Sequence, residues 1–289
     1  IAGSYSTKDK MEDAFQGLDQ QSLFKPVTKK TWTIKNANKI PQTFSDAFKL
    51  AMSPRRGPVC INLPRNILAN KEIFKINSKN QSFNNQNSIK AKSSYIKKAV
   101  KIISSSNKIV IIAGGGIKYN SKYKNVIKLA EILKAPMVTA AGHGDAIPFN
   151  NKLNAGQMGP RGNPVASKLV KEATVIIALG TRLGFNSTFY SYENINKKAK
   201  IIQIELEKSM IGRYFPVAVG INGDAATVTE QLYKEIKKQN IILDIKKWTN
   251  NYLDQRNNFL LKRDNIKFKN FPIQPNGLFK ELRQVLPKN

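Results

Sequence analysis

The sequence predicts an α/β protein built on an open parallel sheet, and three observations support this fold class. First, five apolar residues run without a polar break from Ile109 to Ala113, and three glycines follow them directly. A continuous apolar run bounded by glycine is typical of a strand that is covered on both faces. Second, similar short runs recur along the chain, and third, segments with helical periodicity separate them. Strands that alternate with helices imply crossover connections and a parallel sheet.

The first 68 residues have the pattern strand, helix, strand. Residues 1–4 resemble the end of a buried strand, so we expect the sequence to start inside a domain, and residues 31–34 alternate as in a second strand. The helix that follows begins at Ile40, and its expected apolar face consists of Phe44, Ala47, Phe48 and Ala51. A short buried strand at 59–63 completes this part. We interpret residues 1–68 as the C-terminal part of one α/β domain. Residues 69–90, polar and without periodicity, are interpreted as a linker.

Residues 91–238 alternate between helices and strands and are predicted to form a second domain. The expected strands are 109–113, 136–139, 174–179, 200–206 and 217–221. The expected helices are 93–104, one that includes 126–133, one that begins at Pro164, and 223–232. Residues 239–289 are predicted to contain a helix with Trp248 and Tyr252 and a final helix over 277–286. That last helix is expected to begin a further domain.

Glycine and polar residues follow four of the expected strands, at 114–116, 142–145, 180–182 and 223–224. Because ligands of open parallel sheets bind beyond the carboxyl ends of the strands, these clusters are predicted to gather at one edge. Glycines there let the backbone approach a ligand, and the amides that open the next helix favour a phosphate. The spacing of Gly114, Gly115 and Gly116 does not complete the dinucleotide-binding pattern. A turn that only reverses the chain therefore explains these glycines equally well.

The formal charge of +29 raises the question of nucleic-acid binding, since clustered basic residues neutralise phosphates. Only nine of the 48 basic residues are arginine, the lysines are spread along the chain, and no RNA-binding motif accompanies them. This pattern favours solvated lysine faces over a nucleic-acid interface. An acidic partner domain is a further explanation for part of the charge.

Cysteine, histidine and hydropathy exclude several other classes of protein. Cys60 is the single cysteine and is expected to be buried, so no disulfide can form within the chain, which fits a reducing cytoplasm. His143 is the single histidine, and no metal cluster can be built from one histidine and one cysteine. No apolar run approaches the roughly 20 residues that a membrane-spanning helix needs.

Several short motifs, in their order and spacing, resemble thiamine-diphosphate-dependent enzymes of the acetolactate synthase group. The motifs are Asp13-Ala14-Phe15-Gln16, Lys29 thirteen residues later, Arg55-Arg56-Gly57-Pro58-Val59 and Leu63-Pro64-Arg65. The resemblance implies that residues 1–68 end the pyrimidine-binding domain. It also implies a Rossmann-like (DHS-like) central domain over 91–238 and the start of the pyrophosphate-binding domain within 239–289.

Two further motifs are closest to the sulfoacetaldehyde acetyltransferase-like branch of that group. They are Gly142-His143-Gly144-Asp145-Ala146-Ile147-Pro148 and Leu179-Gly180-Thr181-Arg182-Leu183-Gly184. Acetolactate synthases usually carry Arg-Phe-Asp-Asp where this chain has Arg182-Leu183-Gly184-Phe185.

The resemblance implies a nucleotide site in the central domain, which in this family holds FAD or another adenine nucleotide such as ADP. The residues that it places at this site are Arg55, Gly114, Gly115, Gly116, Gly159, Arg161, Gly162, Gly180, Thr181, Arg182, Glu205, Gly223 and Asp224. The glycines at 114–116 would contact the diphosphate, Arg182 a phosphate or ring, and Glu205 the ribose hydroxyls. Simpler interpretations stay open, because Asp224 is also a good helix N-cap and Glu205 could be a solvated strand end.

The resemblance also places three residues near the catalytic centre of a complete enzyme: Phe15 and Gln16 close to the reacting atoms, and Lys29 at the substrate channel. Without the family, Phe15 would be a core residue and Lys29 a surface lysine. The glutamate that activates thiamine diphosphate and the Mg²⁺ motif that holds its diphosphate are expected outside residues 1–289. We therefore predict that this chain alone catalyses no carboligation.

The implied function is that of a fragment of a cytoplasmic carboligase or acyltransferase. Such an enzyme transfers a two-carbon unit from a 2-oxo acid or related donor to an aldehyde, a ketone or phosphate. Its active site would form between subunits of a homodimer or homotetramer, without nucleic acid or membrane. One alternative is an acetolactate synthase proper. Another is a stand-alone flavin- or nucleotide-binding domain without catalysis, and a third is the nucleic-acid binder, whose affinity would fall steeply with salt.

Overall fold

A computed structural model describes residues 1–9, 17–53, 56–71, 73, 89–120, 123–265 and 272–287. The chain forms two compact units, Ile1–Asn87 and Ser88–Asn289, each with its own parallel sheet. Helices pack against the strands of both sheets, which confirms the predicted α/β fold class. The finer limits predicted from the sequence, with a linker over 69–90 and a further domain after 239, stay predictions.

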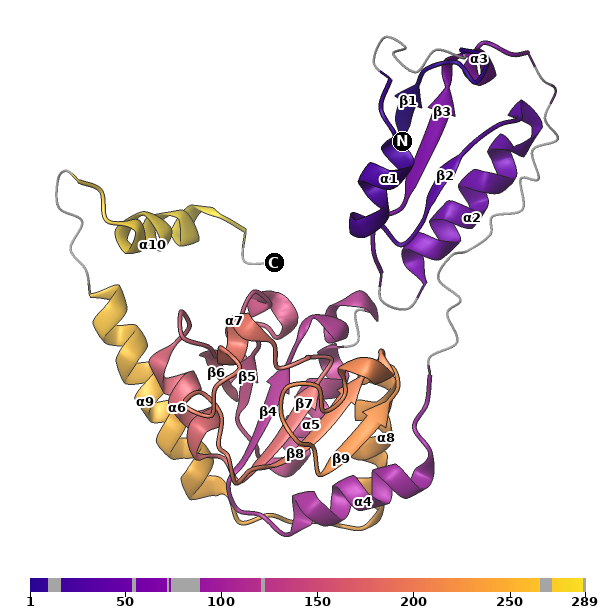
Figure 1. Ribbon diagram of the computed structural model, residues 1–289. Coiled ribbons are helices and arrows are strands. Elements are labelled where there is room, and N and C mark those ends of the chain that lie inside the picture. Colours follow the sequence, from indigo (N-terminus) through magenta and orange to yellow (C-terminus); the bar gives the residue numbers. More distant parts are fainter. Residues whose placement is uncertain are drawn as a thin grey trace. The chain divides into compact units, whose positions relative to one another are not determined.

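The first unit contains three short parallel strands in the order β1 (Ala2–Ser4), β3 (Cys60–Pro64), β2 (Thr31–Thr33) (Figure 1). Its helices are α1 (Gln20–Phe24), α2 (Ile40–Met52) and α3 (Arg65–Leu68), with single 3-10 turns at Lys25–Val27 and Ala37–Lys39. Cys60 is buried and unpaired, as predicted.

Only part of the apolar face predicted for α2 is buried in the core of this unit. Ala47 is buried and Phe44 packs beside it against Ile61 and Leu63 of β3. Phe48 is 57% exposed, so its predicted place in the core is wrong for the described part of the unit. Phe44 and Ala47 therefore lie on the core side of α2, whereas Phe48 lies on a side that the described residues of this unit leave exposed.

The second unit is built on a six-stranded parallel sheet in the order β6-β5-β4-β7-β8-β9 (Figure 1). Its strands are β4 (Ile109–Ala113), β5 (Met137–Thr139), β6 (Asn154–Gln157), β7 (Val175–Leu179), β8 (Lys200–Glu205) and β9 (Val219–Asn222). The chain adds β5 and β6 on one side of β4, then returns to add β7 to β9 on the other. The strand order therefore reverses between β4 and β7, which is where open α/β sheets bind ligands.

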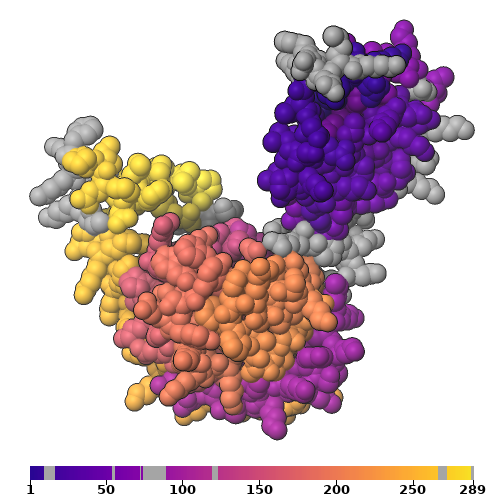
Figure 2. All heavy atoms as spheres, viewed as in Figure 1, coloured from indigo at the N-terminus to yellow at the C-terminus, as the bar shows by residue number. Residues whose placement is uncertain are grey.

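Helices cover both faces of this sheet. One face packs on α4 (Ser93–Ser104), α5 (Tyr123–Leu133) and α8 (Ala225–Lys238), and the other on α6 (Pro164–Glu172) and α9 (Lys246–Asp264). Alternate residues of each strand enter the two cores: Ile109 and Ile111 point to the first, Val110 and Ile112 to the second. In Figure 2 the magenta residues of α4 adjoin the orange residues of the β8–α8 segment, far apart in sequence but in contact. The remaining helices are α7 (Phe185–Thr188) and α10 (Pro275–Val285).

Side-chain hydrogen bonds hold helix α9 against the end of the second unit at which β4 begins. The Trp248 indole donates to the Ile109 carbonyl at 2.9 Å, and the Thr249 hydroxyl to the Lys134 carbonyl at 2.6 Å. Tyr252, fully buried, donates a short hydrogen bond to the Glu172 carboxylate. These contacts lie at the start of β4 and before β5, so the carboxyl ends of the strands are left to other segments.

Two elements of this unit differ from the sequence prediction. The edge strand β6 was not predicted, because Asn154-Ala155-Gly156-Gln157 has no apolar run. Its Asn154 side chain donates to the Pro148 carbonyl and accepts from the Gly156 amide, so polar contacts hold it in place. Helix α8 continues six residues past its predicted end at Leu232, since Ile236 adds another buried turn.

Candidate functional site

The polar and glycine clusters predicted to gather at one edge of the sheet do so. Gly115 follows β4 and touches the His143 ring, which belongs to the segment after β5. Gly180 follows β7 and touches Gly114 and Gly116. The amide of Gly223, after β9, donates to the carbonyl of Glu205 at the end of β8. The carboxyl ends of five strands therefore contribute to one region of the second unit.

The centre of this region is a close backbone crossing between Gly114, Gly116 and Gly180. The Gly114 amide donates to the Leu179 carbonyl at 2.9 Å, and the Gly116 amide to the Gly180 carbonyl at 3.0 Å. A Cβ atom on Gly114 would lie 2.4 Å from the Gly180 oxygen, and one on Gly116 2.8 Å from the Gly180 α-carbon. Gly180 also has a φ of +59°, a left-handed conformation that favours glycine. Packing of backbone on backbone thus requires these three glycines.

Gly115 differs from its two neighbours because its α-carbon faces a side chain. A Cβ atom there would lie 2.7 Å from Cε1 of His143 and 3.0 Å and 3.1 Å from Nε2 and Nδ1. The imidazole is half-buried, and its Nδ1 atom is enclosed without a hydrogen-bond partner among the described residues. Burial and the positive charges of Lys118 and Arg182 lower the pKa of His143, against a smaller raising effect of Asp145. The ring is therefore held neutral at pH 7.

Arg182 is exposed at the end of the turn after β7. Its neighbour Thr181 is buried: the Thr181 hydroxyl accepts the Leu183 amide at 3.2 Å, and its carbonyl accepts the Gln203 side chain at 3.0 Å. These two bonds fix the backbone on both sides of Arg182. The guanidinium makes no described hydrogen bond of its own, so it is a cation on a rigid turn, available to an anion.

Glu205 ends β8 on the same side of the sheet. Burial raises the pKa of its carboxyl group, while the amides of Leu206 and Glu207 and the charge of Arg182 act in the opposite direction. One carboxyl oxygen accepts the Leu206 amide at 3.0 Å. The carboxyl group is thus partly enclosed and is not a fully solvated strand end. Its remaining lone pairs can accept hydroxyl groups of a ligand.

Gly223 and Asp224 have structural roles at the start of α8. Asp224 is its N-cap, and its carboxylate accepts the Thr227 amide at 2.8 Å and the Thr227 hydroxyl at 2.7 Å. A Cβ atom on Gly223 would lie 2.7 Å from the Val228 side chain. The interpretation of Asp224 as a helix cap is therefore confirmed. A contact of either residue with adenine stays a prediction.

Gly159, Arg161 and Gly162 form the turn between β6 and α6. The Gly162 amide donates to the Gly159 carbonyl at 2.8 Å, and the Ser167 hydroxyl bonds both the amide and the carbonyl of Gly159. A Cβ atom on Gly159 would lie 2.8 Å from the carbonyl of Asn186 in α7, whereas Arg161 is exposed. The turn is packed against α7, and its predicted contact with a flavin stays a prediction.

Of the candidates in the first unit, Phe15, Gln16 and Arg55 lie outside the described residues. Lys29 closes the C-terminal end of α2: its ammonium group donates to the Leu50 carbonyl at 2.7 Å and the Ser53 hydroxyl at 2.6 Å. Partial burial there lowers the pKa of Lys29. Its predicted place at a substrate channel is not tested by these contacts.

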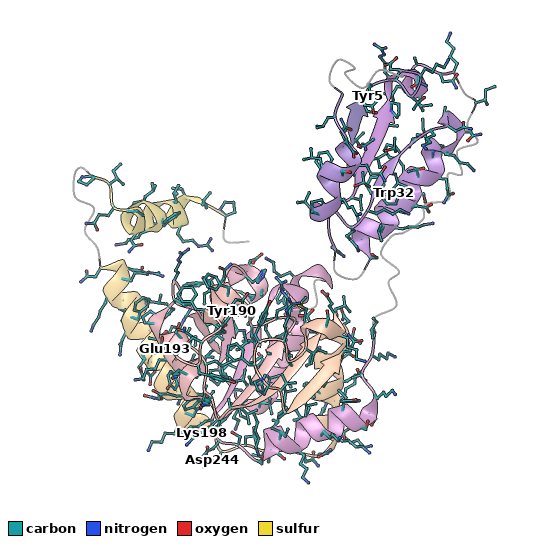
Figure 3. All side chains as sticks on the ribbon, in the orientation of Figure 1. Tyr5, Trp32, Tyr190, Glu193, Lys198 and Asp244 are labelled. Atoms are coloured by element: carbon teal, nitrogen blue, oxygen red, sulfur yellow. The ribbon has the colours of Figure 1, made fainter. Side chains whose placement is uncertain are left out.

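Two features of the second unit were not among the sequence candidates. One is His143, which is absent from the residues that the resemblance places at the nucleotide site, although a lone histidine between two glycines after a strand is a usable signal. The other is an aromatic group around α7, composed of Phe185, Phe189, Tyr190 and Tyr214. Tyr190, labelled in Figure 3, stacks on Tyr214 with ring centroids 4.4 Å apart. Phe189 and Tyr190 both adopt left-handed backbone conformations, which no sequence pattern indicated.

In chemical terms, this edge offers a cation, a neutral imidazole, a partly buried carboxyl group and closely packed glycines. Such a set can bind a ligand that carries both anionic and hydroxyl groups. Among the described residues there is no group of three or more potential metal ligands, and no helix long and apolar enough to cross a membrane.

Comparisons with known proteins bear on the identity of the chain. Residues 96–232 match the model of the thiamine pyrophosphate enzyme central domain. The whole chain is similar to probable acetolactate synthase large subunits from Methanocaldococcus jannaschii and Methanococcus aeolicus. The identities are 32% and 30%, over 99% of this chain and 48% and 49% of those proteins. A sulfoacetaldehyde acetyltransferase from Alcaligenes xylosoxydans xylosoxydans is 33% identical over 77% of this chain and 36% of its own length. The chain thus spans about half the length of the first two relatives.

Proposed function

Because the chain belongs to the thiamine-diphosphate-dependent enzyme family, we propose that it is part of a carboligase or acyltransferase. In this proposal the enzyme takes a two-carbon unit from a 2-oxo acid such as pyruvate and transfers it to a second small molecule. The similarity to acetolactate synthases over 99% of the chain is the observation that carries the proposal. The stand-alone nucleotide-binding domain is less favoured, because those relatives also match the first unit.

In this proposal the second unit supplies an adenine-nucleotide site at the carboxyl edge of its sheet. Arg182 would meet the diphosphate, since a guanidinium can bond two phosphate oxygens at once. Glu205 would accept the ribose hydroxyls, as acidic residues at strand ends do in such folds. The partly enclosed carboxyl group of Glu205 and the exposed guanidinium of Arg182, which has no partner among the described residues, fit a nucleotide of the ADP or FAD type.

Thiamine diphosphate would supply the carbanion chemistry of the enzyme when bound. Phe15, Gln16 and Lys29 are proposed to lie near it, with Arg55 reaching toward the nucleotide. The described residues contain no cluster that could hold Mg²⁺. On the basis of the family resemblance, we propose that the activating glutamate and the metal ligands belong to sequence outside residues 1–289, and that the active enzyme is a homodimer or homotetramer.

Two acceptors are proposed for the transferred unit. An acetolactate synthase would use a second 2-oxo acid, whereas an enzyme of the sulfoacetaldehyde acetyltransferase kind would transfer the unit to phosphate. Gly142-His143-Gly144-Asp145 and Arg182-Leu183-Gly184 support the second branch, and the larger matched share of the acetolactate synthases supports the first.

The test is to express this chain together with its neighbouring coding sequence and to supply thiamine diphosphate and Mg²⁺, with either pyruvate or sulfoacetaldehyde plus phosphate as substrates. Formation of acetolactate and CO₂ from pyruvate would assign the first branch. Formation of acetyl phosphate from sulfoacetaldehyde and phosphate, with release of sulfite, would assign the second. If no cofactor-dependent product forms from either donor, although the protein is folded, the proposal is wrong. The chain of 289 residues alone is the negative control.

A further inference from the structure

His143 is half-buried at the carboxyl edge of the sheet, and the nucleotide site proposed above gives it no role. Its backbone is fixed on both sides: its amide donates to the Ala140 carbonyl at 3.0 Å, and its carbonyl accepts the Ala146 amide at 2.9 Å. The ring lies against Gly115, in the first turn after β4. A side chain larger than hydrogen at Gly115 would displace the imidazole. The absence of a side chain at Gly115 thus leaves space for this ring next to the turn that follows β4.

The hydrogen-bonding state of the ring is unusual. Nδ1 is enclosed and has no partner among the described residues, and Nε2 is also without a described partner but is not enclosed. A buried N–H group without an acceptor is rarer than a buried acceptor without a donor. A neutral imidazole carries its proton on one nitrogen only. We therefore expect the proton on Nε2, with the lone pair on the enclosed Nδ1.

The charges around the ring favour an anionic ligand. Three charged groups act on His143: Lys118 and Arg182 are cations, and Asp145 is an anion. Lys118 is paired with Asp145 at 2.6 Å, whereas Arg182 makes no described ion pair. The net charge acting on the ring is positive, and the uncovered N–H is a donor within electrostatic reach of Arg182, for which no ion pair is described. An oxygen of a phosphate group matches both features.

We propose that His143 contacts the nucleotide directly, and that its Nε2–H donates a hydrogen bond to an oxygen of the diphosphate. This inference rests on the nucleotide site proposed above and adds a residue to it. Arg182 then neutralises charge, while His143 orients the diphosphate over the turn after β4 without adding charge. Gly115 is required because its hydrogen lets the imidazole reach that position.

Three substitutions separate the two ring nitrogens. In His143→Gln the amide nitrogen can occupy the position of Nε2, in His143→Asn it can reach only that of Nδ1, and His143→Ala removes both. ADP is the probe, and its binding to the full chain is measured by calorimetry at pH 7.5 and fixed ionic strength. Losing a hydrogen bond to a charged group should weaken binding about tenfold or more in the Ala and Asn variants. The Gln variant should stay within about threefold of the unaltered chain.

Binding by His143→Ala within twofold of the unaltered chain would overturn the inference and leave the nucleotide site standing. The inference is likewise overturned, and the nucleotide site left standing, if the Gln variant binds ADP as weakly as the Ala variant. If the unaltered chain does not bind ADP, the proposed nucleotide site and this inference both fail.

A second measurement needs no variant. Since the chain has one histidine, ¹⁵N NMR of the ring reports this residue alone. The inference predicts the Nε2–H tautomer in the free protein and a shift of the Nε2 resonance when ADP binds. The Nδ1–H tautomer, or an unchanged Nε2 resonance in the ADP complex, would overturn it.

Discussion

Two groups of residues lie at the carboxyl edge of the six-stranded sheet, and they differ in whether their polar atoms have partners within the protein. The glycine crossing, defined by Gly114, Gly116 and Gly180, has its amides paired and its α-carbons in contact. The polar group consists of His143, Arg182 and Glu205. Among the described residues, the enclosed nitrogen of His143 and the guanidinium of Arg182 have no hydrogen-bond or ion-pair partner, and burial raises the pKa of the Glu205 carboxyl group. The first group is complete within the protein, whereas we propose that a ligand completes the second.

A glycine-rich turn after a strand therefore does not by itself identify a binding site. Gly114 and Gly116 are needed for the crossing with Gly180 whether or not a ligand binds. Unsatisfied polar groups are the stronger indication, because proteins keep such groups mainly where function requires them. Substitutions in the first group should therefore change stability, and substitutions in the second should change binding.

The largest effect is expected from Gly114→Ala. Its Cβ would lie 2.4 Å from the Gly180 oxygen, and backbone cannot move aside as a side chain can. Overpacking of this kind should lower the free energy of unfolding by about 3 kcal/mol. Urea denaturation measures it. Gly184→Ala is the matched control, with no atom within 4 Å of its Cβ, and should change stability by less than about 0.5 kcal/mol. Equal stability of the two variants would contradict the crossing.

The next effect is expected from Arg182→Ala. Removing an exposed guanidinium should leave the free energy of unfolding within about 0.5 kcal/mol. The same change should weaken ADP binding roughly 10- to 30-fold, since a charge-assisted bond to phosphate is lost. Lys200→Ala removes a cation at the opposite end of β8 and serves as the control for net charge. If both variants weaken ADP binding equally, the net positive charge of the chain attracts the nucleotide and Arg182 makes no specific contact with it.

A smaller effect is expected from Gly115→Ala, which lies between the two groups. The added Cβ meets an imidazole that can rotate away, so the loss of stability should be about 1 kcal/mol, less than for Gly114→Ala. Rotation would remove His143 from the ligand, and ADP binding should fall as far as in His143→Ala. Calorimetry and urea denaturation of the same sample check both. Unchanged binding would show that the imidazole position is irrelevant.

The smallest effect concerns Glu205 and pH. Because burial raises the folded-state pKa of its carboxyl group above the ordinary value of 4.5, the folded chain holds this proton more tightly than the unfolded chain. The contribution of Glu205 to stability is therefore complete below pH 4.5. It is lost as pH rises through the raised pKa. Glu205→Gln removes this loss, so the variant should gain stability relative to the unaltered chain between pH 4.5 and 7.

Urea denaturation at several pH values gives that difference directly. Glu193→Gln, at an exposed carboxylate that Figure 3 labels, is the control for the loss of one negative charge. A constant difference between Glu205→Gln and the unaltered chain across this range would mean that the carboxyl group is fully solvated.

The sequence predicted most of the six-stranded sheet, because buried parallel strands leave continuous apolar runs such as Ile109 to Ala113. It did not predict β6, which polar side chains hold at the edge, nor the exposure of Phe48 on α2. At the site, the topology correctly brought the clusters after β4, β5 and β7 together. What could not be predicted is which atoms remain unsatisfied. The open Nε2 of His143 and the enclosed carboxyl group of Glu205 depend on three-dimensional packing.

We propose that an adenine nucleotide binds at the carboxyl edge of the second unit, and hydrogen exchange of the full chain with and without ADP tests this most directly. We predict slower exchange of backbone amides in 114–117, 142–146 and 181–184 when ADP is present, with α9 unchanged. Protection confined to other segments, or none at saturating ADP, would contradict it.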